Sequence, residues 1–320
     1  MNKTSHATTL TGMIVGLGVL VWISAVPAAT PVNWDAVSGR NIMLFSPGQS
    51  GWEWILTGSD HSASKSVRKG TPCLECHEGE QAKMGKLIGS GKKIEPQPVA
   101  GNPGSIPVKV KFAQLGDRLY VRLSWQETPQ HSSQDHEYRA KVAMMFNDGT
   151  VKATKVAGCW SACHLDLKGM PTASGADDLS MYLFASRSKI KRTGGGKNFK
   201  PAAALAALMK KAYFLELWQA DLNPDKPAHA VDGYVLDKRH MNPTPAIAAT
   251  STFSDGRWVV EFSRKLFQSG SGRFALIPGK TYTVGFAIHD SNTTGRFHHV
   301  SFGYTFALDS GRADFVAKQP

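Results

Sequence analysis

The fold is decided by the stretch VKVKFAQLGDRLYVRLSW, residues 108–125, in which apolar residues occupy every second position on either side of Gly116-Asp117. Successive side chains of a β-strand point to opposite faces, so period two predicts two strands, each with one buried face. A Gly-Asp pair between two such runs is typical of a hairpin turn. We therefore expect an antiparallel hairpin here.

The same alternation recurs through the remainder of the chain. The runs that show it are residues 140–146, 212–218, 250–253, 258–262, 281–288 and 299–306, with a turn at 254–256. Helical patterns are few: the stretch after Cys73, and Pro201–Lys211, where proline takes a plausible first position. Many short strands between Gly, Pro and Asp turns predict a mainly β chain, with an antiparallel immunoglobulin-like β-sandwich over residues 105–320.

The segment before the sandwich differs in composition. Residues 29–104 are rich in Gly, Ser, Lys and Trp and show weak strand periodicity. A chain of 320 residues with 42% apolar side chains is long enough for about two domains. We expect residues 29–104 to form a small loop and helix segment organised around something other than a large apolar core.

The N-terminus has the pattern of an export signal over residues 1–28. Lys3 precedes the apolar run 10–23, and Val26 and Ala28 satisfy the small-residue rule for cleavage after Ala28. The alternative is an uncleaved membrane anchor, because the run borders on spanning length. Proline and small residues at its end favour cleavage, so we expect a periplasmic protein that meets the membrane only if the signal remains attached.

Four cysteines form two close pairs, and a histidine follows each pair directly. The run Cys73-Leu74-Glu75-Cys76-His77 has the C-x-x-C-H form of a c-type haem attachment site, in which two thiols bond the haem edge and the histidine binds the iron. The second run, Cys159 and Cys163 followed by His164, has one more residue between its thiols. The sequence therefore predicts two c-type haems, with His77 and His164 as proximal ligands.

Other uses of the cysteines are less favoured. Local disulfides would close rings too short to gain much loop entropy. A zinc site built from both pairs would leave the two histidines unexplained. A thioredoxin-like motif lacks its βαβ setting.

Each haem needs a sixth ligand unless it is catalytic. For the first haem we expect His61, twelve residues before Cys73 in a Gly- and Ser-rich segment, with Met43 and Met84 as alternatives. For the second haem the histidines that border the last two strands are the better candidates. They are His289, His298 and His299.

A family resemblance narrows the choice for the second haem. The residues that carry it are 138–146, 169–171, 284–290 and 296–302. Through them, residues 105–320 resemble the cytochrome c-552/dimethyl sulfoxide (DMSO) reductase-like haem-binding domain found in gamma subunits of ethylbenzene dehydrogenase. The resemblance implies a β-sandwich around one non-covalent b-type haem with methionine and lysine ligands.

This chain departs from the family at both ligand positions. Where the family methionine is expected the chain carries Cys159–His164, and where the lysine is expected it carries His298. The resemblance thus implies a covalently held haem with His164 and His298 as axial ligands. His299 would point to the opposite face of its strand.

These features favour an exported dihaem c-type cytochrome that carries single electrons between periplasmic redox proteins, with both haems bound by two histidines. One alternative, implied by the resemblance alone, is an electron-transfer subunit of a molybdenum enzyme. The other is a haem reductase or peroxidase with an open iron site. Two six-coordinate irons leave no position for substrate, which favours a carrier over an enzyme.

The net charge of +12, from 37 Lys and Arg against 25 Asp and Glu, is the remaining feature. Nucleic acid is not an expected partner, because no binding motif accompanies the charge and the compartment is wrong. One basic stretch without acidic residues is a candidate docking patch for an acidic redox partner, although a solvated loop would have the same composition. It comprises Arg187, Lys189, Lys191, Arg192, Lys197 and Lys200.

Overall fold

The computed structural model describes Met1 and residues 32–129, 137–164, 181–191, 195–196, 198–268, 270–290, 297–309 and 311–319. Residues 32–320 cluster as one compact unit. The expected export signal at residues 1–28 lies outside the described residues. Within the described ranges, no helix has both the length and the apolar character needed to cross a membrane.

The described strands form one hydrogen-bonded sheet whose order is β7-β6-β5-β4-β10-β11-β1-β2-β3-β9-β8, with β12 beside β10 and β13 beside β12. All neighbours are antiparallel except the pair β12 and β13. The strands are β1 (Gly39–Phe45), β2 (Ser105–Leu115), β3 (Arg118–Gln126), β4 (Ala140–Asn147), β5 (Leu215–Leu222), β6 (His229–Val235), β7 (Arg239–Met241), β8 (Ile247–Ser254), β9 (Arg257–Lys265), β10 (Thr281–His289), β11 (His299–Val300), β12 (Tyr304–Leu308) and β13 (Phe315–Ala317).

Strands β2 and β3 form the hairpin predicted from residues 108–125. Their register pairs Val108 with Trp125 and Leu115 with Arg118. Gly116 has φ +57°, a left-handed conformation that glycine adopts at little cost. Val108 and Trp125 are fully buried, as the alternating pattern requires.

The core lies between two halves of the sheet that face each other. Rings from both halves meet there: Trp218 on β5 lies 6.3 Å from Phe262 on β9 and 4.6 Å from Phe146 on β4, measured between ring centroids. Leu123 on β3 and Phe286 on β10 belong to the same buried cluster. This arrangement confirms the prediction of a mainly β, sandwich-like fold.

The run 299–306 was expected to be one strand and is instead divided into β11 and β12. The break falls where Gly303 approaches Gly158: a Cβ on Gly303 would lie 3.0 Å from the Gly158 nitrogen. The Ser301 amide still donates to the Phe286 carbonyl of β10 at 2.9 Å, and the strand resumes at Tyr304. Phe302, within this break, lies in the wall of a cavity described below.

The N-terminal segment supplies part of the sheet. Strand β1 pairs with β2 over its whole length, from Gly39 beside Lys111 to Phe45 beside Ser105, and Phe45 also pairs with Val300 on β11. It therefore joins the two halves of the sheet. Strand β1 precedes the domain boundary expected near residue 104 and its partner β2 follows it, so this strand pair crosses the expected boundary.

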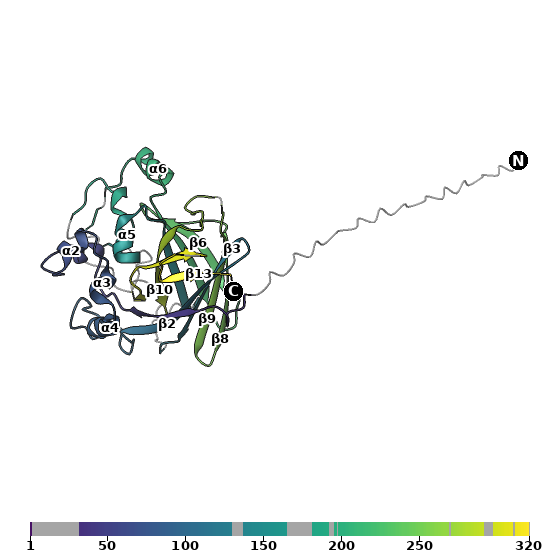
Figure 1. The fold of residues 1–320 in the computed structure, drawn as a ribbon, viewed down its shortest axis with the longest axis horizontal. Helices are drawn as coiled ribbons and strands as arrows, with labels where there is room; N and C mark the ends of the chain where they lie inside the picture. Colours follow the sequence, from purple (N-terminus) through teal and green to yellow (C-terminus); the bar gives the residue numbers. More distant parts are fainter. Residues whose placement is uncertain are drawn as a thin grey trace. The chain divides into compact units, whose positions relative to one another are not determined.

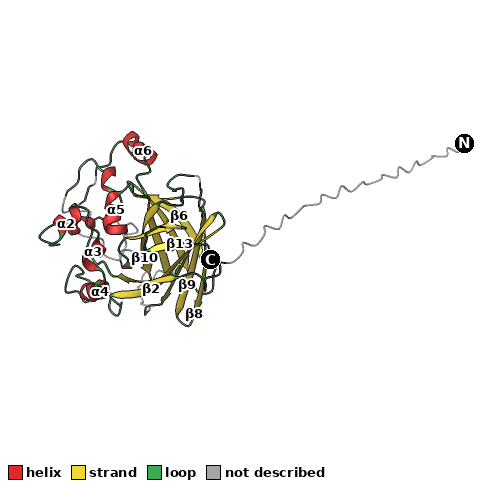
Figure 2. Ribbon diagram, in the orientation of Figure 1, coloured by secondary structure: helices red, strands yellow, loops and turns green. Residues whose placement is uncertain are grey.

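The helices gather on one side of the sheet (Figures 1 and 2). They are α1 (Trp52–Ile55), α2 (Ser64–Arg68), α3 (Cys73–His77), α4 (Gln81–Gly89), α5 (Lys152–Ala157) and α6 (Ala202–Lys210), with the 3-10 turns η1 (Gly158–Ala162) and η2 (Phe184–Ser186). Helix α6 begins after Pro201, close to the predicted position. Both cysteine pairs lie on this helical side, on α3 and at η1.

Candidate functional site

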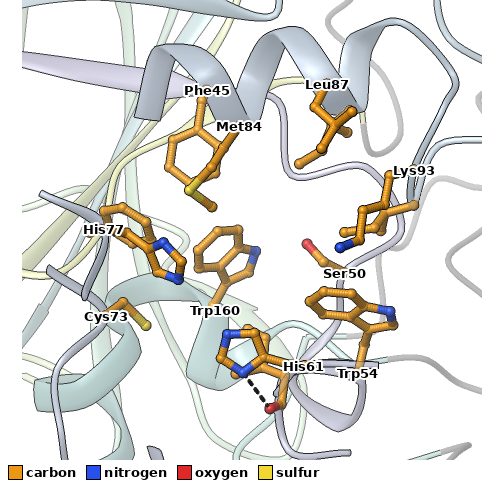
Figure 3. A pocket seen from close by; sticks show the side chains of 14 residues that line it. Phe45, Ser50, Trp54, His61, Cys73, His77, Met84, Leu87, Lys93 and Trp160 are labelled. Atoms are coloured by element: carbon orange, nitrogen blue, oxygen red, sulfur yellow. Dashed lines mark hydrogen bonds between the residues drawn. The ribbon is translucent and has the colours of Figure 1, made fainter. Parts of the chain in front are cut away.

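An apolar cavity lies between α1, α3, α4, β1 and η1 (Figure 3). Its volume is about 720 Å³ when the solvent at its mouth is included. The lining residues are Phe45, Ser50, Trp54, Ile55, His61, Cys73, His77, Met84, Leu87, Ile88, Lys93, Ile94, Trp160 and Phe302. Three residues of the sequence-predicted first haem site, His61, Cys73 and His77, thus meet in one cavity.

Helix α3 arranges the first cysteine motif. It begins after Pro72, and a helix places residues three and four apart on one face, so Cys73, Cys76 and His77 share a side. Cys73 is buried in the cavity wall, and burial raises the pKa of its thiol to about 12. Cys76 is exposed at the surface. Both thiols are free.

The two histidines of the cavity face each other. The ring centroids of His61 and His77 lie 6.1 Å apart. Two imidazoles that bind one metal ion through Nε2, with bonds of about 2 Å each, place their ring centres roughly 6 Å apart. The observed separation therefore fits one iron between them.

The second nitrogen of each ring is held by the protein. His61 Nδ1 donates to the Ile55 carbonyl at 3.2 Å, and His77 Nδ1 donates to Glu80 Oε2 at 3.0 Å. Hydrogen bonds of this kind fix the tautomer and orientation of metal-binding histidines. Neither Nε2 atom has a hydrogen-bond partner in the described part of the chain, so both remain available to a metal. Burial, followed by the charge of nearby His77, lowers the pKa of His61, which favours the neutral form that binds iron.

Two polar groups in the wall complete the fit to a haem. Trp160 Nε1 is buried without a hydrogen-bond partner among the described residues. Lys93 lines the cavity and reaches solvent. An unpaired donor and a cation in an otherwise apolar pocket suit a flat apolar ring that carries carboxylates. The residues present therefore fit a c-type haem.

The methionines proposed as alternative ligands are placed differently. Met84 on α4 lines the cavity (Figure 3), so it stays an alternative to His61 by position. Met43 on β1 is not among the cavity-lining residues. The ring-to-ring geometry of His61 and His77 favours the histidine.

The second cysteine motif lies on the sheet. Cys159 packs against β10 so closely that a Cβ on Gly285 would lie 2.5 Å from its Sγ. Cys163 packs against the buried cluster that contains Ala287 of β10, which is paired with Ala143 of β4. Burial raises the pKa of both thiols to about 12, and both are free.

His164, the residue after this motif, is buried and has both ring nitrogens engaged. Nδ1 donates to Glu53 Oε1 at 2.6 Å and Nε2 donates to the Tyr182 carbonyl at 2.8 Å. Its ring stacks on Tyr182 at 3.7 Å. A carboxylate on Nδ1 is the usual partner of a metal-binding histidine. The donor chemistry fits a haem, which would take the place of the Tyr182 carbonyl at Nε2.

The expected distal ligands of the second haem form a separate group. His298 and His289 are stacked with ring centroids 4.5 Å apart. His299 lies on the other face of its strand, as alternation predicts, and its Nε2 donates to the Pro103 carbonyl at 2.6 Å. No ring contact joins His164 to His298 in the described residues, so the predicted axial pair is not brought together here.

The alternative uses of the cysteines find no counterpart in the described residues. All four cysteines are free thiols. No group of three or more His, Cys, Asp or Glu side chains that could hold a metal ion occurs within the described ranges.

The candidate docking patch is only partly at the surface. Lys189 and Lys191 are exposed and Lys200 is half-buried, whereas Arg192 and Lys197 lie outside the described residues. Arg187 is buried between the rings of Tyr182 and Phe199, 3.9 and 4.0 Å from their centroids. Arg187 therefore belongs to the interior and not to the patch, because two aromatic faces hold its guanidinium.

Sequence reasoning missed several residues of the site. Trp160 lies inside the second motif yet lines the first cavity, and Phe302 stacks on His77 at 6.0 Å. Glu53 holds His164 from a position 111 residues away. One sign of Glu53 was available: it is a lone carboxylate within Trp52–Leu56, an otherwise apolar run.

Comparison with known proteins identifies relatives of this chain. Residues 218–301 match the profile of the ethylbenzene dehydrogenase family. Cytochrome c-552 of Stutzerimonas stutzeri is 35% identical over 316 residues, 97% of this chain and 99% of its own length. Cytochrome c-551 of Rhodocyclus tenuis is 30% identical over 291 residues, 89% of this chain and 98% of its own. The chain therefore belongs to the family of c-type cytochromes that includes these cytochromes c-552 and c-551.

Proposed function

We propose that this protein is an exported dihaem c-type cytochrome that carries single electrons between periplasmic redox proteins. The observation that carries the proposal is the cavity in which His61 and His77 face each other at 6.1 Å beside Cys73. A c-type haem bound there supplies a one-electron iron couple.

The residues around the first cavity suit electron transfer better than catalysis. His61 and His77 would hold the iron from both sides, because their ring centroids lie 6.1 Å apart and each has its Nδ1 fixed by a hydrogen bond. Two protein ligands leave no site for a substrate, and a rigid ligand pair changes little on reduction. His61 thus speaks against a reductase or peroxidase with an open iron.

The second haem is supported by the second motif. Cys159 lies against β10, Cys163 packs on a neighbouring buried cluster, and His164 has the carboxylate partner that metal-binding histidines use. We propose covalent attachment through the two thiols, His164 as proximal ligand and His298 as distal ligand. His289 is the alternative on the same face, stacked on His298.

We propose that the surface around the mouth of the first cavity is a docking face for an acidic redox partner. Leu87, with 43% of its surface exposed, and Lys93 both line the cavity and reach solvent. Residues 81–94 contain no acidic residue and four exposed lysines, of which Lys93 lines the cavity: Lys83, Lys86, Lys92 and Lys93. Charge complementarity at such a face accelerates encounter with the partner. Lys189 and Lys191 form a second basic surface.

One further function is favoured by a specific observation. The match of residues 218–301 to the ethylbenzene dehydrogenase family makes an electron-transfer subunit of a molybdenum enzyme the second candidate. Alignment over nearly the full length of two proteins named as cytochromes favours an independent carrier. Co-purification with a large catalytic subunit would favour the second candidate.

The count of haems tests the proposal directly. A reduced pyridine-haem spectrum and an intact mass should show two covalent haems, which add about 1.2 kDa to the processed chain. Replacing Cys73 and Cys76 by alanine, or Cys159 and Cys163, should each remove one haem. An unmodified mass, or one haem that persists in both variants, would overturn the dihaem proposal. Cleavage after Ala28 is read from the same mass.

A further inference from the structure

The short helix α1 connects the two proposed haem sites. At its start, the Trp52 amide donates to the Cys163 carbonyl at 2.8 Å. Glu53 binds His164 Nδ1, and the carbonyl of Ile55, the last residue of the helix, accepts from His61 Nδ1. Four consecutive residues thus orient a ligand histidine at each site, which makes the two sites one structural unit.

Each proximal histidine has a glutamate on Nδ1, but the two pairs differ in their surroundings. Glu80 accepts from His77 at 3.0 Å, and 49% of the Glu80 side chain is exposed. Glu53 accepts from His164 at 2.6 Å, and the side chains of this pair are 1% and 0% exposed. Solvent screens the first carboxylate and not the second. The carboxylate on Nδ1 therefore has a stronger electrostatic effect on His164 than on His77.

From this difference we infer that the second haem is the lower-potential centre of the protein and that Glu53 is the residue that makes it so. The inference rests on the proposed function. A carboxylate that accepts a hydrogen bond from Nδ1 of a ligand histidine makes Nε2 more basic toward the iron, and this stabilises the oxidised iron. A buried carboxylate also stabilises Fe3+ relative to Fe2+ by its charge, and low polarity strengthens this effect. Glu53 is a positioning residue, because it acts on the iron through His164.

The order of potentials sets the direction of electron flow within the chain. With both haems bound, one electron would pass from the iron that His164 would hold to the iron that His61 and His77 would hold, so that one iron would be oxidised as the other is reduced. Trp160 lies between the sites, since it belongs to the second motif and lines the first cavity. Its ring is 5.6 Å from that of Phe302, which stacks on the ligand His77 at 6.0 Å. On this order, transfer within the chain is favourable from the second site to the first, whose cavity has Lys93 in its wall.

A potentiometric titration of the full holoprotein, followed by optical and electron paramagnetic resonance (EPR) spectra, tests the inference. The wild-type chain should titrate in two one-electron steps. Glu53→Gln keeps a hydrogen-bonding group and removes the charge. The variant should raise the lower reduction potential by about 59 mV, which is about a factor of ten in the equilibrium constant of a one-electron couple. The upper potential should not change.

Glu80→Gln is the matched control, because it makes the same change at the exposed pair. It should shift only the upper step, and by less than Glu53→Gln shifts the lower one. The inference is overturned if Glu53→Gln moves the upper step or neither step. It is also overturned if Glu80→Gln has the larger effect.

A second measurement does not depend on the folding of Glu53→Gln. The variant with Cys159 and Cys163 replaced by alanine should keep the first haem only, and its single potential should match the upper wild-type step. A match to the lower step overturns the assignment. A wild-type chain with a single haem overturns the dihaem proposal itself, whereas two haems with the opposite order of potentials overturn only this inference.

Discussion

Gly285 lies at the centre of β10, where the backbone passes directly under Cys159. A Cβ at this position would lie 2.5 Å from Cys159 Sγ and 3.1 Å from the Cys159 nitrogen. Non-bonded heavy atoms prefer separations of about 3.5–4.0 Å, so in Gly285→Ala the sulfur must move by roughly 1 Å. The strand cannot retreat easily, because Gly285 is paired with Met145 on β4.

The expected cost follows from this overlap. Forcing a methyl group into a packed interior destabilises a protein by about 1–3 kcal/mol. For a chain of this size that corresponds to a decrease of roughly 2–10 °C in Tm. Because the displaced atom is the thiol proposed to attach the second haem, we also expect Gly285→Ala to lose the proposed thioether bond to Cys159 or the whole second haem.

The assay combines a thermal scan by circular dichroism with the haem count by pyridine-haem spectrum and intact mass. Gly58→Ala is the matched control, because its Cβ would meet only Ser64 Oγ, at 3.4 Å, an ordinary contact. It should keep both haems and the wild-type Tm. A Gly285→Ala protein with the wild-type Tm and both haems would show that the packing of Cys159 on β10 is not that of the mature protein.

Three further predictions concern the sixth ligand of the first haem, the docking face and the Asp148 carboxylate. His61→Ala should convert the first haem from low-spin to high-spin in EPR while Met84→Ala leaves it low-spin; the reverse result would assign Met84 as the ligand. Replacing Lys83, Lys86, Lys92 and Lys93 by glutamate should slow electron exchange with an acidic redox partner at low ionic strength and weaken its salt dependence. The same change at Lys189 and Lys191 should slow the exchange less, and equal rates for the two variants in stopped-flow traces would argue against the cavity mouth as the docking face. Burial raises the pKa of Asp148, but hydrogen bonds from Lys280 and Thr150 outweigh this and hold the pKa below its ordinary value. The ionised carboxylate therefore stabilises the fold above about pH 4, and this contribution is lost as the pH falls through the lowered pKa. Asp148→Asn should flatten the acid-side decline of the unfolding free energy in urea titrations, and an unchanged slope would contradict this role.

The sequence by itself predicted the mainly β fold and the motif of the first proposed haem site, but it missed β1 and the division of 299–306 into two strands. Alternation over residues 108–125 was sufficient for the hairpin, because strand period and burial are local properties that each residue pair repeats. The Cys73–His77 spacing was sufficient for a haem motif, because one turn of helix brings its three groups to one face. His61 was also predicted, and the structure brings it into the same cavity.

Only the tertiary structure decided which distant residues share a site. Strand β1 joins the two halves of the sheet because it pairs with both β2 and β11. The residue pattern of β1 alone does not identify these partners. Glu53 reaches His164 across 111 residues, and Trp160 of the second motif turns into the first cavity. Such contacts follow from the close approach of whole elements, as where Gly158 meets Gly303, and periodicity along the chain carries no information about that approach.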